Sequence, residues 1–176
     1  MRAAEAYLRE RRREGQPAVF DLGCGARKTQ GAFGVDAAWL PGVDLVHDLG
    51  ARPYPLPVLE EAWRIVRPGG RVLVRTPHFS GSYAWKDPTH RRAFTSESFH
   101  YFGENGYSYY THARFAVRRV RLKYFLEEHV WPWPYRAWGR AVQWLLDRHP
   151  TFGERFACYL VGGIDEIQVT LEAVKP

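Results

Sequence analysis

The distribution of apolar positions predicts helices that alternate with short strands. Residues 2–14 mix alanines with charged side chains and contain no proline, which indicates an amphipathic helix that stops at Gly15. Three short apolar runs follow, and each leads to an acidic residue (residues 18–22, 31–36 and 42–47). Apolar runs bounded by glycine are typical of buried parallel strands. The connection between the first two runs is too short for a full crossover helix, so we expect a turn or an unusual pairing there.

The rest of the chain predicts a further helix, more strands and a helical insertion. Residues 58–66 have apolar positions at helical spacing, and a Pro-Gly-Gly turn leads from them into a strand at 71–76. A short capped helix is expected at 96–102. Regular alternation predicts the last two strands, residues 115–125 and 164–174. Between them lies an insertion rich in tryptophan, at about 126–160.

This order of elements predicts an α/β fold in a single domain over residues 1–176. Hydrophobic residues make up 45% of the sequence, which suffices for a core of its own. No apolar run approaches the length of a membrane span, and the N-terminal stretch is charged, so we expect a cytoplasmic protein. Two cysteines alone, one of them between glycines, make a disulfide framework improbable.

The formal charge of +6 raises the possibility of a nucleic-acid partner. Arginines cluster near the start of the chain and again in the first of the last two predicted strands (Arg9, Arg11, Arg12, Arg13; Arg114, Arg118, Arg119, Arg121). Alternation places part of the second cluster on the solvated face of a strand. We favour a solvated face over a polyanion site, although both interpretations stay open.

The first strand ends in a turn suited to a ligand. Asp21 is followed by Leu22 and then by Gly23, Cys24 and Gly25. Glycines can adopt positive φ and allow a bound molecule to approach the backbone. Asp36 ends the second strand, where a carboxylate accepts hydrogen bonds from ribose hydroxyls in nucleotide-binding α/β folds. Another acid, Asp48, follows the third apolar run.

Residues 18–49 resemble the cofactor half of class I S-adenosylmethionine-dependent methyltransferases. The resemblance implies a Rossmann-like sheet, mostly parallel with a reversed edge strand. It implies that the glycine turn contacts the methionine moiety, that Asp36 binds the ribose and that Lys28 meets the cofactor carboxylate. Adenine would be bound by the last two residues of the stretch (Asp48 and Leu49). A dinucleotide site is the nearest competitor, but it needs a third glycine at the position of Lys28.

The sequence departs from this family in the middle of the sheet. A further central strand would be expected between Asp48 and Val58, but the prolines of residues 52–57 cannot form one. One explanation is a natural deletion that leaves a narrower sheet. The other is that a segment between Pro57 and Val58 is missing from this sequence. We favour the second, because the loss of an inner strand would expose apolar faces.

Residues 77–95 form the candidate acceptor site, because ligands bind at the carboxyl ends of strands in open α/β sheets. His78 and His90 are the candidate general bases, since imidazole titrates near neutral pH. Candidate substrate-binding residues in the same segment are Tyr83, Asp87 and Arg91. The spacing of the two histidines and the aspartate does not favour a metal site.

Several functions remain open at this level. The first is methyl transfer to a small-molecule or lipid-linked acceptor. The second is cofactor binding without catalysis, and the third is an RNA methyltransferase or RNA-binding protein that uses the arginines. The tryptophan-rich insertion is interpreted as a lid for a large acceptor, as a dimer or peripheral membrane surface, or as a satellite core.

Overall fold

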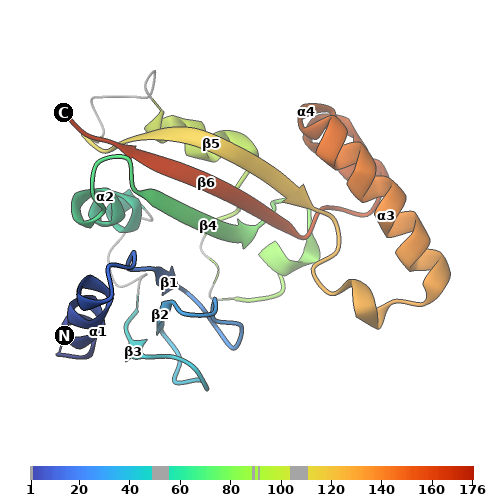
Figure 1. The fold of residues 1–176 in the computed structure, drawn as a ribbon. Coiled ribbons are helices and arrows are strands. Elements are labelled where there is room, and N and C mark those ends of the chain that lie inside the picture. The colour runs from blue at the N-terminus through green and yellow to red at the C-terminus, as the bar shows by residue number, and fades with distance from the viewer. Residues whose placement is uncertain (1, 49–55, 89, 91, 104–110) are drawn as a thin grey trace. The chain divides into compact units, whose positions relative to one another are not determined.

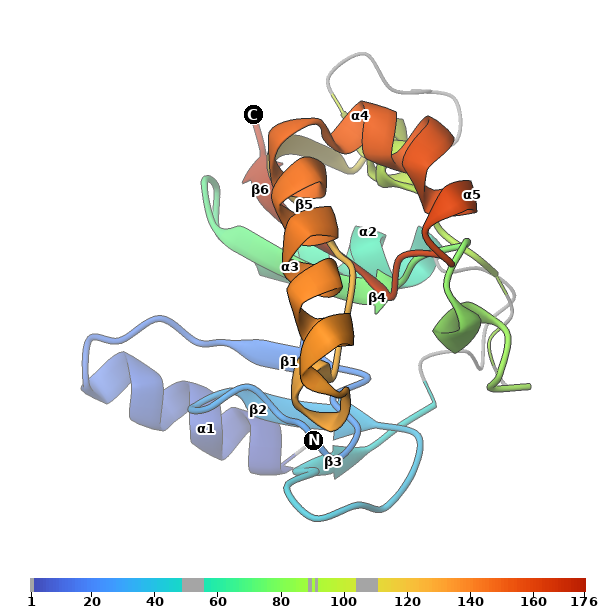
Figure 2. The same ribbon diagram turned by 90° about the vertical axis from the view of Figure 1, so that its right-hand side faces the viewer.

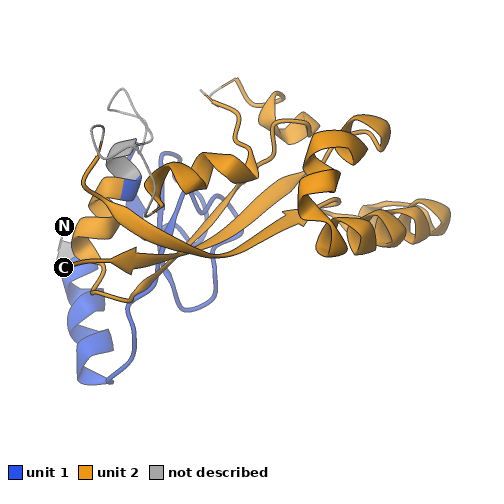
Figure 3. Ribbon diagram, turned by 90° about the horizontal axis from the view of Figure 1, so that it is seen from above, with its two compact units in different colours: residues 1–59 blue, residues 60–176 orange. Residues whose placement is uncertain are grey.

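The computed structural model shows a mixed α/β structure, which confirms the predicted class at that level (Figure 1). The described residues are 2–48, 56–88, 90, 92–103 and 111–176. They form two compact units, residues 1–59 and residues 60–176 (Figure 3). Each unit has a sheet of its own among these residues. The single domain expected over residues 1–176 stays a prediction.

The first unit contains a small parallel sheet preceded by a helix. Its elements are α1 (Arg2–Arg13), β1 (Phe20–Leu22), β2 (Phe33–Asp36) and β3 (Leu45–Val46). All three predicted strands are present, although shorter than expected. The strand order is β1-β2-β3, with both pairings parallel. Turns replace a crossover helix between β1 and β2.

Tyr7 attaches α1 to this sheet. Its hydroxyl lies 3.0 Å from the carbonyl oxygen of Val19 and 3.1 Å from that of Gly31, and it also accepts a hydrogen bond from the Val19 N–H. Its ring lies 5.8 Å from the ring of Phe20 and 5.5 Å from that of Phe33. The helix therefore covers the strands with an aromatic side chain that also satisfies the backbone where β1 begins.

The second unit consists of an antiparallel sheet with helical segments. Its strands are β4 (Arg71–Pro77), β5 (Arg114–Lys123) and β6 (Glu166–Val174), and α2 (Leu56–Ile65) contains the boundary between the units. The short helical segments η1 (Ser82–Ala84) and η2 (Ser96–Phe102) follow β4. The remaining helical elements are η3 (Glu128–Val130), α3 (Trp133–Arg148), α4 (Pro150–Phe152), the π-helical turn η4 (Gly153–Ala157) and α5 (Cys158–Leu160).

The position of the reversed strand corrects the sequence prediction. The strand order is β4-β6-β5, and β6 pairs antiparallel with both neighbours. The reversed strand is therefore central rather than at an edge. Its alternation explains this position: Ile167, Val169 and Leu171 are fully buried, and β6 can donate and accept on both sides. Phe102 of η2 covers Phe115 of β5, with their rings 6.3 Å apart.

Two glycines allow the loop after β4 to touch the segment before β6. A Cβ at Gly81 would overlap the backbone carbonyl oxygen of Ile164. Gly163 has φ of 98°, and a Cβ there would overlap the carbonyl oxygen of Ser80. These two backbones can approach each other because neither glycine carries a side chain.

Gly81→Ala is expected to destabilise the protein by roughly 2 to 3 kcal/mol, because the new methyl group would meet backbone rather than a movable side chain. Urea denaturation measures the change. Ser82→Ala, one residue away and exposed, is the matched control and should change stability little. Equal stability of the two variants would show that the loop moves away from Ile164 without cost.

The aromatic insertion forms a helical arm, which we define as residues 128–160. It follows β5 and lies beyond that end of the sheet of its unit (Figure 1). Figure 2 looks onto this end of the sheet, and α3 lies in front of the strands there. Part of its aromatic surface is packed: the Trp131 ring stacks on Phe125 at 5.4 Å, and the Trp138 indole N–H donates to the Tyr124 hydroxyl. No helix among the described residues has the length and apolarity needed to cross a membrane.

Candidate functional site

The glycine turn after β1 has the backbone conformation that its sequence predicts. Gly23 and Gly25 have φ of 71° and 54°. The N–H groups of Gly23 and Cys24 both donate to the carbonyl oxygen of Val35, at 2.7 and 3.2 Å. Nothing lies within 4 Å of the position that a Cβ would take at either glycine. The turn is therefore tied to β2 and open on its glycine side.

Asp36 joins this turn at the end of β2. Its carboxylate accepts hydrogen bonds from the backbone N–H groups of Gly25 and Ala38, at 2.8 and 3.0 Å. The side chain is half-buried. A carboxylate has about four acceptor positions, so these two bonds leave it able to accept from further donors. The structure thus brings three predicted residues together: Gly23, Gly25 and Asp36.

Asp21 and Cys24 support the same turn from within. The Asp21 carboxylate accepts a hydrogen bond of 2.6 Å from the Thr29 N–H, which closes the loop between β1 and β2. The Cys24 side chain is buried. Burial raises the pKa of its thiol, and the negative charges of Asp21 and Asp36 raise it further. The buried thiol of Cys24 is therefore in surroundings that disfavour its thiolate form.

Lys28 is held by an acid that the sequence did not single out. Its ammonium lies 2.8 Å from the Asp44 carboxylate, which also accepts a 2.7 Å hydrogen bond from the Gly34 N–H. The hydrogen bond from Lys28, followed by that from Gly34, lowers the pKa of Asp44. A Cβ at Gly34 would lie 2.6 Å from the Lys28 side chain. The glycine in β2 therefore leaves room for this ion pair. In the sequence, Asp44 was only an acid inside the third apolar run.

The residues expected at adenine are only partly described. Asp48 lies after β3 with an exposed side chain, and Leu49 lies outside the described residues. Both residues of this predicted subsite therefore stay predictions.

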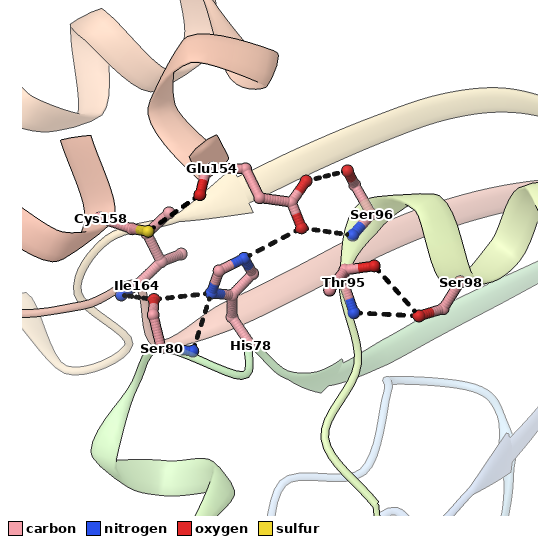
Figure 4. Close-up of polar contacts among 8 residues, drawn as sticks. All are labelled: His78, Ser80, Thr95, Ser96, Ser98, Glu154, Cys158 and Ile164. Carbon is pink, nitrogen blue, oxygen red and sulfur yellow. Dashed lines mark hydrogen bonds and ion pairs between the residues drawn. The ribbon is translucent and has the colours of Figure 1, made fainter. Parts of the chain in front are cut away.

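In the second unit, His78 lies at the centre of a buried polar network (Figure 4). The imidazole is fully buried directly after β4. Its Nδ1 accepts a 3.2 Å hydrogen bond from the Ser80 N–H and lies 2.8 Å from the Ser80 hydroxyl. Because Nδ1 is an acceptor, the proton belongs on Nε2, which lies 3.3 Å from the Glu154 carboxylate. Both ring nitrogens are thus occupied.

Glu154 extends the network from the helical arm to η2. Its carboxylate accepts a 2.8 Å hydrogen bond from the Ser96 N–H and a short one from the Ser96 hydroxyl. Burial alone would raise its pKa, but the hydrogen bonds from His78 and Ser96 outweigh burial and lower the pKa. Glu154 was not predicted from the sequence, because nothing but its place in the predicted helical insertion distinguished it from other acids.

Ser80 and Cys158 complete this network. The Ser80 hydroxyl donates to His78 and accepts a 3.0 Å hydrogen bond from the Ile164 N–H. The Cys158 thiol donates to the Glu154 backbone oxygen, and burial raises its pKa. Ser80, His78 and Glu154 form a chain of hydrogen bonds, but each of the three side chains is bonded to other groups of the protein. The network joins the end of β4, η2 and the helical arm. Its role is therefore to hold these three segments in position.

The other predicted acceptor residues lie in and after η1. His90 Nε2 is 3.9 Å from the Asp87 carboxylate, and both side chains are partly exposed. The Lys86 ammonium lies 3.8 Å from the centre of the Tyr83 ring. Arg91 lies outside the described residues. Within the part of the chain that the structure describes, no group of three histidine, cysteine or acidic residues could hold a metal ion.

Two arginines of β5 have carboxylate partners. Arg118 makes a two-pronged contact with Glu172, at 3.1 and 2.9 Å, and Arg121 lies 3.3 Å from Asp147. These ion pairs are consistent with a solvated strand face.

Comparison with known proteins gave no match among protein-family models, curated proteins or solved structures.

Proposed function

We propose that this chain binds S-adenosylmethionine and transfers its methyl group to a small-molecule or lipid-linked acceptor. The observation that carries the proposal is the junction of Asp36 with the glycine turn at the carboxyl ends of β1 and β2. Ligands of α/β folds bind outside this end of parallel strands. The sequence resemblance then suggests which ligand the junction serves.

The residues of the junction fit this cofactor in kind. Positive φ and open space at Gly23 and Gly25 allow a ligand to approach the backbone closely. The carboxylate of Asp36 keeps acceptor positions for ribose hydroxyls beside its two N–H bonds. A contact of Lys28 with the cofactor carboxylate would need its ion pair with Asp44 to open.

The strand arrangement gives separate support. In the doubly wound order 3-2-1-4-5-6, the fourth strand lies between the first and the fifth. By the resemblance, β4 is the family's fifth strand, and a fourth strand is the one that the sequence lacks. Among the described residues, β1 and β4 are both edge strands. Each of these two strands therefore has a free edge at which a further strand could pair with its own sheet.

The bound cofactor would supply a methyl group already activated by its sulfonium. The tasks of the chain are therefore to orient the two reactants and to exclude water. The glycine turn and Asp36 would fix the cofactor. Of the two candidate bases, His90 is partly exposed and can exchange a proton with an acceptor, while His78 has both nitrogens bonded in the interior. Methyl transfer to an activated nucleophile needs no base.

Binding of the cofactor without transfer is the second candidate. The compressed middle of the chain favours it, because the strand that the family places between Asp48 and Val58, with acceptor-side residues at its end, is missing from the sequence. In that case the chain would hold S-adenosylmethionine and produce no S-adenosylhomocysteine from any acceptor supplied.

Native mass spectrometry with S-adenosylmethionine, S-adenosylhomocysteine and NAD tests the proposal. We expect one-to-one complexes with the first two ligands and none with NAD, because Lys28 stands where a dinucleotide site needs glycine. The absence of both complexes would contradict the proposed function. The intact mass, compared with 20.4 kDa, also tests whether a segment between Pro57 and Val58 is missing.

A further inference from the structure

The helix α3 has one face fixed against the protein. Gly139, Val142 and Leu146 are its buried residues. A Cβ at Gly139 would lie 2.6 Å from the Phe125 ring, and Leu146 fills the space beside Gly153. These close contacts set the rotation of the helix about its axis, since neither side can turn without overlap.

The opposite face of α3 carries two tryptophans and two arginines. Successive residues of a helix are rotated by about 100° about its axis, so these four side chains fall within a sector of about 80° that lies opposite the buried face. We call this set the outer face (Trp133, Arg140, Trp144 and Arg148). The indoles of Trp133 and Trp144 are 71% and 63% exposed, and three helical turns place them about 16 Å apart. The Arg148 guanidinium lies 5.9 Å from the Trp144 ring centre.

We propose that the outer face of α3 docks on the surface of an anionic lipid bilayer. Tryptophan prefers the boundary between water and hydrocarbon, because its ring is apolar and its N–H is polar. Two indoles on the same face of a helix that lies along the membrane surface can enter that boundary together. The arginines among them match the negative surface potential of anionic lipids.

The charge of α3 supports this partner. It carries Arg136, Arg140 and Arg148 against one acid, Asp147, and that acid pairs with Arg121 of β5. No carboxylate of a described residue pairs with Arg136 or Arg140. A second copy of the chain is a poorer partner, because a two-fold contact through this face would bring the same arginines together.

The helical arm provides further apolar surface beside α3. Its later segments expose four more large side chains, of which Leu160 is 85% exposed (Phe152, Phe156, Tyr159 and Leu160). A helix of 16 residues is shorter than the roughly 20 needed to cross a bilayer, so α3 would lie along the surface. Docking does not depend on the proposed methyl transfer, because every residue of the outer face lies in α3.

Vesicle co-sedimentation with the full chain tests the proposal. We expect the protein to sediment with phosphatidylcholine vesicles that contain phosphatidylglycerol, and to bind pure phosphatidylcholine much more weakly. Removal of Arg140 and Arg148 (R140Q/R148Q) should weaken binding by about fivefold for each arginine. Trp133→Ala combined with Trp144→Ala should weaken it by at least tenfold, because burial of about 60 Å² of ring surface already corresponds to that factor.

The matched control is Trp39→Ala in the first unit, where an indole is 80% exposed outside the helical arm. It should leave vesicle binding unchanged, and circular dichroism checks that each variant is folded. Quenching of tryptophan fluorescence by brominated lipid gives a second measurement on the wild-type protein.

Three results would overturn the proposal: no sedimentation of the wild-type protein with anionic vesicles, equal binding by the double tryptophan variant, or an equal loss in Trp39→Ala. A dimer in sedimentation velocity that the double tryptophan variant abolishes, without vesicle binding, would instead assign the face to a second copy.

Discussion

Replacement of Asp36 by alanine is expected to weaken the binding of S-adenosylmethionine by roughly ten- to a hundredfold. The variant removes the predicted acceptor of the ribose hydroxyls. It also removes the acceptor of the Gly25 and Ala38 N–H groups, so the glycine turn loses its tie to the end of β2. Calorimetric titration of the cofactor into wild-type and variant protein measures the effect.

Two further variants locate the cause of this loss. Asp36→Asn keeps an acceptor oxygen of the same shape but loses the charge, so its affinity should lie between the wild-type and alanine values. Glu5→Ala, on the exposed side of α1, removes a carboxylate away from the turn and should not change the affinity. Equal affinities of wild-type and Asp36→Ala protein would contradict the ribose assignment.

Replacement of Glu154 by alanine is expected to lower the free energy of unfolding by about 3 kcal/mol. The carboxylate is the shared acceptor for the His78 imidazole and for both the N–H and the hydroxyl of Ser96. Without it, the buried imidazole and the two half-buried donors of Ser96 lose their acceptor. Chemical denaturation at neutral pH, followed by tryptophan fluorescence, measures the loss.

Glutamine at the same position separates hydrogen bonding from charge. Its oxygen can accept from His78 and the Ser96 N–H, and its amide can donate to the Ser96 hydroxyl, so Glu154→Gln should cost only about 1 kcal/mol at neutral pH. A loss as large as that of the alanine variant would show that the charge itself is essential.

The pH dependence of stability gives a second readout for Glu154. The pKa of its carboxyl is lowered in the folded state, so its contribution is complete above the ordinary glutamate pKa and is lost as pH falls through the folded value. The wild-type protein should therefore lose stability in acid more steeply than Glu154→Gln. Parallel profiles of the two proteins in this range would contradict the assignment.

The part of the chain proposed to bind the cofactor was largely predictable from local sequence. Gly23 and Gly25 adopt positive φ because glycine alone does so without strain, and the strands on both sides follow from short apolar runs. Asp36 was expected at the end of β2 for the same reason. The ion pair of Lys28 with Asp44 was not expected. It joins residues of two loops, and the distance between these loops depends on β2 and β3 being neighbours.

The proposed acceptor side was less predictable. His78 was expected to be a general base in a loop, but the structure places it in the interior with Glu154, a residue 76 positions later. Likewise the reversed strand was expected at an edge, but the reversed strand of this sheet is β6, and it lies between β4 and β5. Alternation of apolar residues shows that a strand has a buried face, but it does not show which strands lie on its two sides.

The sequence by itself determined the class of the fold, the glycine turn and the acid that meets it, because these depend on backbone conformations and periodicities set within a few residues. The tertiary structure alone decided which polar side chains share a site. It placed His78 with Glu154 and Ser96, and it directed Trp133 and Trp144 outward while Trp131 packs on Phe125. Those outcomes depend on contacts between distant segments, which no local pattern specifies.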